Sequence, residues 1–113
     1  MIRAATSLIL YLLTAPFGSE TVDVRDRGAV DLKTFECRDI NRSSLIQRVC
    51  HDHAQRYLIV GISGSYDDYC ELPQQTFDGF MTAPSMGQFF KANIRGSGPD
   101  DRYDCRTRRR ANH

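Results

Sequence analysis

Four cysteines constrain this chain more than any other feature of its sequence. All of them lie beyond an apolar N-terminal run at residues 4–15, at Cys37, Cys50, Cys70 and Cys105. One basic residue, Arg3, precedes the run and Pro16 follows it, which is the layout of a secretory signal peptide. In an exported chain an even set of cysteines indicates disulfide bonds. The sequence therefore predicts a periplasmic or secreted protein with two disulfides.

The apolar run predicts a cleaved leader at residues 1–19, with the cut near Gly18 or Ser19. It has about half of the ~20 residues that a helix needs to cross a bilayer, so no stable membrane insertion is expected after cleavage. A buried N-terminal helix or strand is the alternative interpretation. The lack of amphipathic spacing in the run favours the leader.

The mature chain has room for one hydrophobic core. The full sequence holds 15 basic and 14 acidic residues, so removal of Arg3 with the leader brings the net charge to about zero. No overall charge draws such a protein to nucleic acid or to anionic lipid. Because a core of this size is only marginally stable, two disulfides worth roughly 2–4 kcal/mol each have a structural role to fill.

The apolar pattern after residue 43 predicts an antiparallel β-meander. Its strands are expected at residues 45–50, 56–62 and 66–72, with turns between them. Leu58, Val60 and Ile62 share one face of the central strand and are expected to line the core. The polar stretch before Cys37, residues 20–36, is interpreted as an extended lead-in.

Two short helices are expected after Pro73, which is suited to the start of a helix. Phe77, Phe80 and Met81 recur at helical spacing in the first helix. Ser85 is a candidate N-cap of the second helix, whose apolar stripe is Met86, Phe89, Phe90 and Ile94. The predicted fold class is α+β, with three to four strands followed by two helices. The predicted segments are a leader at 1–19, a lead-in at 20–36, a domain at 37–105 and a basic tail at 106–113.

Several motifs along these elements occur in an order that resembles a known family. They are Ser43-Ser44, Ile46, Val49, Asp52, Leu58-x-Val60-x-Ile62, Tyr69, Leu72-Pro73, Phe80, Ala83, Ser85-x-Gly87, Phe89-Phe90 and Ile94-Arg95. Over residues 43–95 the chain resembles the KTSC domain, a small module found at the C-terminus of some lysyl-tRNA synthetases and alone in short bacterial proteins. The resemblance implies a compact α+β module of undetermined function with no established catalytic residues, for which RNA binding has been suggested.

A nucleic-acid surface on such a module would draw on aromatic and basic side chains. The candidates here are Tyr66, Tyr69, Arg56, Lys91 and Arg95. The family's Y-x-Y pair falls on Asp67 and Tyr69, and Lys91 replaces the family's helix asparagine. Tyr66 and Tyr69 are three residues apart, so in a regular strand they point to opposite faces and do not form one stacking platform. Asp67 and the adjacent Asp68 repel phosphate.

Strand geometry favours one pairing of the four cysteines. Cys37 and Cys50 are equidistant from a turn centred on residues 43–44, so they face each other if residues 35–40 form a strand. Cys70 then pairs with Cys105. The competing scheme, Cys37 with Cys105 and Cys50 with Cys70, bridges strands that are separated by a third strand. That separation, about 10 Å, exceeds the usual Cα spacing of a disulfide.

Two clusters suggest an enzyme at first sight. His51 and His53 point to one face at a strand end, but two histidines alone do not make a metal site, and His113 lies at the extreme tail. Cys50 and His51 are adjacent, so in a strand they point to opposite faces, and Cys50 has an expected disulfide partner. A metal- or thiol-dependent enzyme is thus the weakest alternative, and no catalytic residue, metal ligand or cofactor is predicted.

The basic tail ends with Arg108, Arg109 and Arg110, which can contact an envelope protein or an anionic ligand through charge. A solvated terminus is the simpler interpretation. The function that the sequence favours is an exported, non-enzymatic binding or interaction module of unknown ligand. An RNA-binding module is the first alternative.

Overall fold

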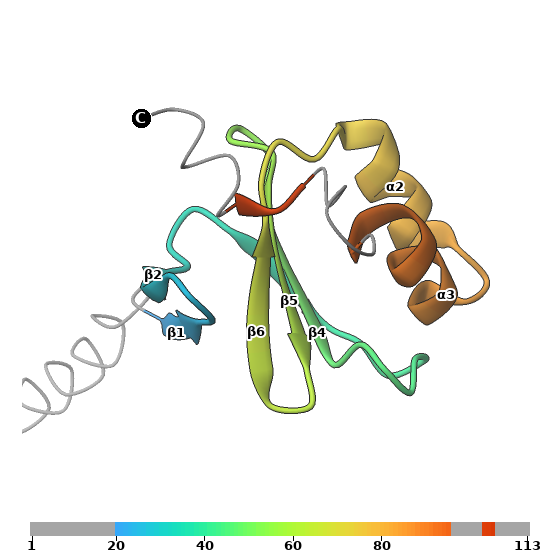
Figure 1. Ribbon diagram of the computed structural model, residues 1–113, viewed down its shortest axis with the longest axis horizontal. Coiled ribbons are helices and arrows are strands. Elements are labelled where there is room, and N and C mark those ends of the chain that lie inside the picture. The colour runs from blue at the N-terminus through green and yellow to red at the C-terminus, as the bar shows by residue number, and fades with distance from the viewer. Residues whose placement is uncertain (1–19, 96–102, 106–113) are drawn as a thin grey trace, which may run out of the picture.

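A six-stranded sheet in the order β2-β1-β6-β5-β4-β3 forms the centre of the molecule (Figure 1). The computed structural model describes residues 20–95 and 103–105. The predicted leader (1–19) and the basic tail (106–113) lie outside these residues. The strands are β1 (Thr21–Val24), β2 (Gly28–Asp31), β3 (Glu36–Asp39), β4 (Arg48–Asp52), β5 (Tyr57–Ile62) and β6 (Ser65–Tyr69).

The strands after residue 43 form the predicted meander, since β4, β5 and β6 pair antiparallel in sequence order. β3 pairs antiparallel with β4, which gives the strand expected around Cys37. The sheet is larger than the three to four strands expected, because the lead-in is not a simple extended segment. It forms the antiparallel hairpin β1–β2, and β1 joins β6 in parallel through Val24 and Tyr66.

Both predicted helices are present. α2 (Gln74–Thr82) begins directly after Pro73, and α3 (Met86–Phe90) begins after Ser85. The Ser85 hydroxyl accepts a hydrogen bond from the Gln88 backbone N–H at 3.3 Å, which confirms it as an N-cap. The chain then continues into one π-helical segment, η1 (Lys91–Arg95), which the sequence pattern did not predict.

The helices cover one face of strands β3 to β6 (Figure 1). The β1–β2 hairpin joins the sheet only through the Val24–Tyr66 pair, and its apolar side chains pack over the other face of β4 and β5. Leu58 and Val60 point toward the helices, whereas Tyr57 and Ile59 of the same strand point away from them. The buried core on the helix face consists of Ile46, Val49, Leu58, Val60, Tyr69, Leu72, Phe80, Met86, Phe90, Ile94 and Tyr103. The core on the hairpin face is smaller and consists of Val22, Val24, Leu32, Cys50, Tyr57, Ile59 and Cys105.

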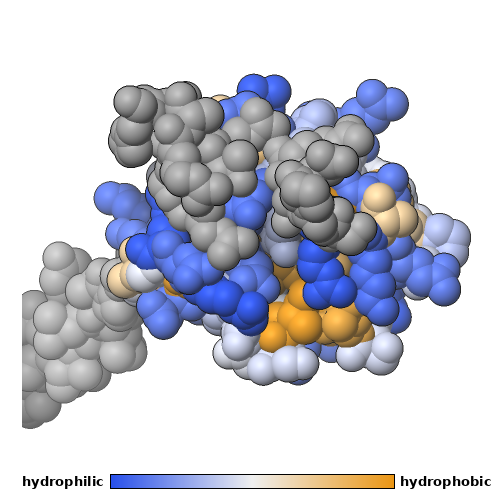
Figure 2. All heavy atoms as spheres, viewed as in Figure 1, coloured by the Kyte–Doolittle hydropathy of each residue, from blue (hydrophilic) through white to orange (hydrophobic). Residues whose placement is uncertain are grey.

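Ile62 packs against the helix-face core, as its alternation with Leu58 and Val60 predicted. It is only half-buried, as are Leu45 and Phe89 in the same group. Figure 2 shows the corresponding surface: hydrophobic residues gather between the β5–β6 hairpin and α3, and hydrophilic residues surround them. No helix among residues 20–95 and 103–105 is long and apolar enough to span a membrane.

The two disulfides have the pairing that strand geometry favoured. Cys37 and Cys50 are cross-strand partners of β3 and β4 with their Cα atoms 4.0 Å apart. Cys70 bonds to Cys105, with a Cα separation of 5.0 Å. The backbone before Cys105 runs along the end of β6, where Asp104 bridges Tyr69 and the Cys70 N–H donates to the Tyr103 carbonyl at 2.8 Å. All four cysteines contribute to the hairpin face of the sheet.

Candidate functional site

A groove of about 250 Å³ lies between the sheet edge at β3 and helix α2. Its walls combine charged and apolar side chains from three elements and one turn. β3 contributes Glu36 and Arg38, β4 contributes Val49, and His53 follows directly after β4. The side of the groove formed by α2 consists of Gln74, Phe77, Asp78 and Met81.

His53 connects the two sides of this groove. Its Nε2 lies 3.3 Å from Glu36 Oε1 in β3, and its Nδ1 lies 3.1 Å from Gln74 Oε1 in α2. Both ring nitrogens face acceptors, and only the protonated imidazole has two N–H donors to satisfy them. The hydrogen bond to Gln74 first, and then the one to Glu36, raise the pKa of His53 above its ordinary value.

His51 lies beneath His53 and is 1% exposed. Its ring stacks on Phe77 with centroids 3.8 Å apart and meets His53 edge-on at 4.3 Å. Neither ring nitrogen has a hydrogen-bond partner. Burial, and secondarily the neighbouring His53, lower the pKa of His51 to about 4. His51 is therefore neutral at physiological pH, and its ring fills the space between β4 and Phe77 of α2.

Both histidines lie on the helix face, as their spacing predicted, but they contact each other rather than a shared ligand. In the part of the chain that the structure describes, no group of three or more His, Cys, Asp or Glu residues is arranged to hold a metal ion. Asp52 points to the other face, where it accepts hydrogen bonds from the Thr34 hydroxyl at 2.7 Å and the Gln55 N–H at 3.2 Å. Cys50 is disulfide-bonded, so no thiolate stands beside His51.

The two tyrosines of the candidate nucleic-acid surface lie on opposite faces of β6. The register with β5 continues without interruption from Ser65 to Tyr69, so no bulge brings them together. Tyr69 is 6% exposed and meets Phe90 edge-on in the helix-face core, at 5.5 Å between centroids. Tyr66 packs on the hairpin face, where its ring covers Gly61. A base has no access to both rings from one side.

The three basic candidates are also dispersed. Arg56 occupies the turn before β5 with φ of 53°, and its carbonyl accepts from the Leu72 N–H. Lys91 is exposed at the start of η1. Arg95 lies over the Phe90 ring and, with Tyr69, lines a pocket of about 200 Å³. The rest of that pocket is mostly acidic, which disfavours phosphate; it consists of Arg25, Asp26, Asp67, Asp68 and Asp104.

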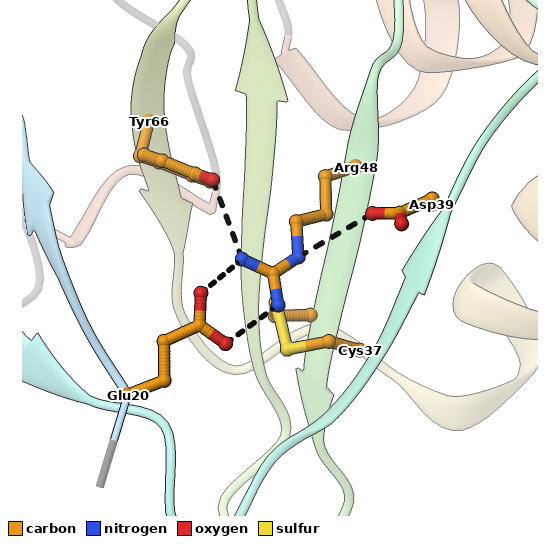
Figure 3. Close-up of polar contacts among 6 residues, drawn as sticks. Glu20, Cys37, Asp39, Arg48 and Tyr66 are labelled. Carbon is orange, nitrogen blue, oxygen red and sulfur yellow. Dashed lines mark hydrogen bonds and ion pairs between the residues drawn. A yellow bond between two sulfur atoms is a disulfide. The ribbon is translucent and has the colours of Figure 1, made fainter.

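An ion-pair network on the hairpin face was not predicted. Arg48 of β4 donates two hydrogen bonds to the Glu20 carboxylate, at 2.6 and 2.8 Å, and its Nε lies 3.7 Å from Asp39 (Figure 3). The Tyr66 hydroxyl lies 3.5 Å from the same guanidinium and accepts a hydrogen bond from it (Figure 3). The hydrogen bond from Arg48 lowers the pKa of Glu20. Only one signal in the sequence bears on this contact: Arg48 is two residues before Cys50 and thus shares its face.

Comparison with known proteins identifies the family to which the central part of the chain belongs. The family model of the KTSC domain matches residues 42–97. This segment is a KTSC domain. A KTSC domain protein from Yersinia pestis, known from its crystal structure, is 26% identical and has a TM-score of 0.52, covering 56% of this chain and 89% of that chain. No curated protein matches the chain by sequence.

The KTSC domain begins before β4 and ends after η1, so β1, β2 and β3 precede it. Each disulfide crosses its boundary. Cys50 within the domain bonds to Cys37 before it, and Cys70 within the domain bonds to Cys105 after it. The groove crosses the boundary as well, because Glu36 and Arg38 belong to β3, which precedes residue 42.

Two motifs of the KTSC domain meet at the start of α3. The Ser43 hydroxyl accepts hydrogen bonds from the Leu45 and Ile46 N–H groups, which fixes the loop before β4. A Cβ on Gly87 would meet the Leu45 side chain at 3.5 Å, an ordinary van der Waals contact, so Gly87 of α3 lies next to this loop. In Ser85-x-Gly87 the serine caps the helix and the glycine faces the loop, which are structural positions.

Proposed function

We propose that this chain is a small exported binding module without catalytic activity, in which two disulfides fasten extra segments to a KTSC domain. One observation carries the proposal: each disulfide joins a cysteine inside residues 42–97 to one outside them. Such an arrangement requires an oxidising compartment to form and persist. The apolar run at residues 4–15 supplies a leader for reaching it.

The side chains most suited to chemistry support binding rather than catalysis, because they are engaged in the fold. Cys50 is consumed in a disulfide. His51 is enclosed between Phe77 and His53, and its pKa of about 4 makes it a poor proton acceptor near pH 7. Asp52 accepts hydrogen bonds from Thr34 and Gln55. A binding surface, unlike an active site, needs no reactive thiol, imidazole or carboxylate.

Export is tested by producing the full chain in a bacterial host with an oxidising periplasm. The protein should be recovered from that compartment with an N-terminus near Glu20, and alkylation without reductant should label no thiol. The matched control is Leu10→Arg, which places a charge in the apolar run and should leave the chain in the cytosol. Wild-type protein found in the cytosol with Met1 retained and four alkylated cysteines would overturn the proposal.

The RNA alternative is tested by titration with a single-stranded RNA at increasing salt. We expect weak or no binding by the folded domain, because Tyr69 is buried and cannot stack on a base. Asp67 and Asp68 also form ion pairs with Arg25 and Arg27, so these cations are already neutralised and attract phosphate less. Residual affinity should come from Arg108, Arg109 and Arg110 and should disappear when residues 106–113 are deleted. Low-micromolar binding by the deleted protein that is lost in Tyr69→Ala would favour the RNA function instead.

A further inference from the structure

The groove between β3 and α2 adjoins the open edge of the sheet. We infer that it binds an extended peptide segment of a partner protein, which adds to β3 as a seventh strand and places a lysine or arginine in the groove. This inference rests on the proposed binding function and specifies the class of partner. It depends on three features: the free backbone groups of β3, the helix beside them and the charge of the groove.

β3 is the last strand in the sheet order, so one of its sides has no strand partner among residues 20–95 and 103–105. Cys37 and Cys50 have Cα atoms only 4.0 Å apart, the short spacing of a non-hydrogen-bonded pair. The N–H of Ile40, the residue directly after β3, donates to the Gln47 carbonyl at 3.0 Å. In the alternating antiparallel pattern, Glu36, Arg38 and Ile40 therefore bond toward β4. The N–H and C=O groups of Cys37 and Asp39 point to the open side.

A strand added beside Cys37 and Asp39 would direct every second side chain to the helix face, because side chains alternate along a strand. Glu36 and Arg38 lie on that face, since their cross-strand partners are His51 and Val49. α2 stands above the same edge and contributes Phe77, Asp78 and Met81 to the groove. An edge strand beside a helix is an arrangement in which main-chain hydrogen bonds supply affinity and a pocket for alternate side chains supplies specificity.

One carboxylate of the groove favours a basic side chain. The lining holds two acidic residues, Glu36 and Asp78, and two basic ones, Arg38 and His53. Glu36 lies 3.7 Å from Arg38 and 3.3 Å from His53, so these cations already neutralise it. Asp78 accepts a hydrogen bond from the neutral Gln74 side chain at 2.9 Å. A lysine or arginine entering between β3 and α2 would pair with Asp78, with the Phe77 and Met81 side chains available to its aliphatic stem.

The edge is held in place before any partner arrives. The disulfide of Cys37 fixes β3 to the domain, and His53 ties Glu36 to Gln74 of α2. Binding to a fixed edge avoids the entropy cost of ordering it, which raises affinity.

The probe is a fluorescent nonapeptide of alternating threonine and serine with lysine at its centre, titrated against the oxidised full chain after mass analysis has verified both disulfides. We expect saturable binding that weakens about tenfold or more when the central lysine is replaced by glutamate. A peptide N-methylated at the two residues beside the lysine loses main-chain donors but keeps the charge. It should also bind about tenfold more weakly.

The protein variants separate backbone from side-chain effects at one position. Asp39→Pro removes an N–H that points to the open side, and should weaken binding about tenfold. Asp39→Ala removes the same carboxylate but keeps that N–H, so it is the matched control and should lose less peptide affinity than Asp39→Pro. Asp78→Asn should weaken the lysine peptide but not a leucine-centred peptide. Melting curves identify any variant that does not fold, and the N-methylated peptide tests the same hydrogen bonds without a change in the protein.

Equal affinity for the lysine, glutamate and N-methylated peptides, or no binding by any of them, would overturn the groove assignment. Binding of the lysine peptide that is unaffected by Asp39→Pro and Asp78→Asn would also overturn it, because the contact would then be elsewhere. These results leave the export experiment untouched. A chain that is exported and cross-linked but does not bind the peptides contradicts this inference alone, whereas a reduced cytosolic chain contradicts the proposed function.

Discussion

The two faces of the sheet are stabilised by different means. The helix face is covered by α2, α3 and η1, which bury large side chains such as Phe80 and Phe90. The hairpin face is covered by two four-residue strands, and its core includes the disulfide sulfurs of Cys50 and Cys105. The helices lie within the KTSC domain, and the hairpin lies outside it.

The difference shows how a small domain acquires a second covered face. A short hairpin buries too little apolar area to order the flanking segments by packing alone. Cross-links reduce the entropy of the unfolded chain and so stabilise the folded state without more core. Both disulfides lie on the face where packing is thinnest, and each ends in a flanking segment. The four predictions below test this contrast.

The largest effect is expected on the helix face. Phe80→Ala removes a side chain that is fully buried between the sheet and the helices, and should cost about 3–5 kcal/mol in free energy of unfolding. Phe35→Ala is the matched control, because Phe35 is only half-buried, against Tyr57 on the hairpin face. Urea unfolding should give a clearly smaller loss for Phe35→Ala. Equal losses would contradict the contrast between the faces.

Removing each disulfide should lower stability by an amount that depends on the length of the loop it closes. The Cys70–Cys105 bond closes a span of 35 residues, and replacing both cysteines with alanine should cost about 4 kcal/mol. The Cys37–Cys50 bond spans 13 residues, and the same replacement should cost about 3 kcal/mol. Urea unfolding of the two double variants measures both values. If neither variant loses stability, packing alone holds the hairpin face.

Acid should destabilise the helix face through His51. The folded-state pKa of His51 is about 4, below its ordinary value, so the unfolded chain takes up this proton first as the pH falls. The contribution of neutral His51 to the free energy of unfolding is fully present above about pH 6.5. It is lost between about pH 6.5 and 4, and amounts to on the order of 3 kcal/mol. Four charged or titratable groups surround the ring. Asp52 lies at the end of β4 and His53 directly after it, Glu36 lies on β3, and Asp78 lies on α2.

His51→Phe keeps a ring against Phe77 and removes the titrating group, so unfolding measured from pH 7 to 4 should lose this component of the pH dependence. His53→Gln is the control. His53 is exposed and its pKa is raised, so its contribution has the opposite sign, present at low pH and lost as the pH rises. A steep acid loss that persists in His51→Phe would refute the assignment to His51.

The smallest effect is expected from the Arg48 network. Glu20→Gln removes the carboxylate that accepts two hydrogen bonds from Arg48 on the hairpin face. The Glu20 side chain is 53% exposed, so solvent screens the pair, and the cost should be about 0.2–1 kcal/mol and decrease with added salt. Asp39→Asn should cost less still, since Asp39 is 86% exposed. If Glu20→Gln lowered the free energy of unfolding as much as the removal of a disulfide does, the expectation of a small effect would be wrong, and the network would be a main source of stability on this face.

Local sequence patterns predicted the parts of the fold that depend on neighbours in the chain. Alternation in the segment from Leu58 to Ile62 identified a strand and its buried face, and Phe77, Phe80 and Met81 identified the first helix. The ordered motifs identified the KTSC domain, and the equal spacing of Cys37 and Cys50 from one turn favoured the correct disulfide pairing. The groove was missed because Glu36 and Gln74 approach only after β3 and α2 are placed on the same sheet.

By itself the sequence determined the domain, the strand meander, the two helices and the cysteines available for cross-linking, because periodicity, caps and turn spacing act over a few residues. Only the tertiary structure decided that the lead-in folds into a hairpin with β1 parallel to β6, that His51 stacks on Phe77 and meets His53 edge-on, and that Arg48 binds Glu20. These contacts join residues far apart in the chain. Their geometry follows from burying whole faces of the sheet together, for which no local pattern exists.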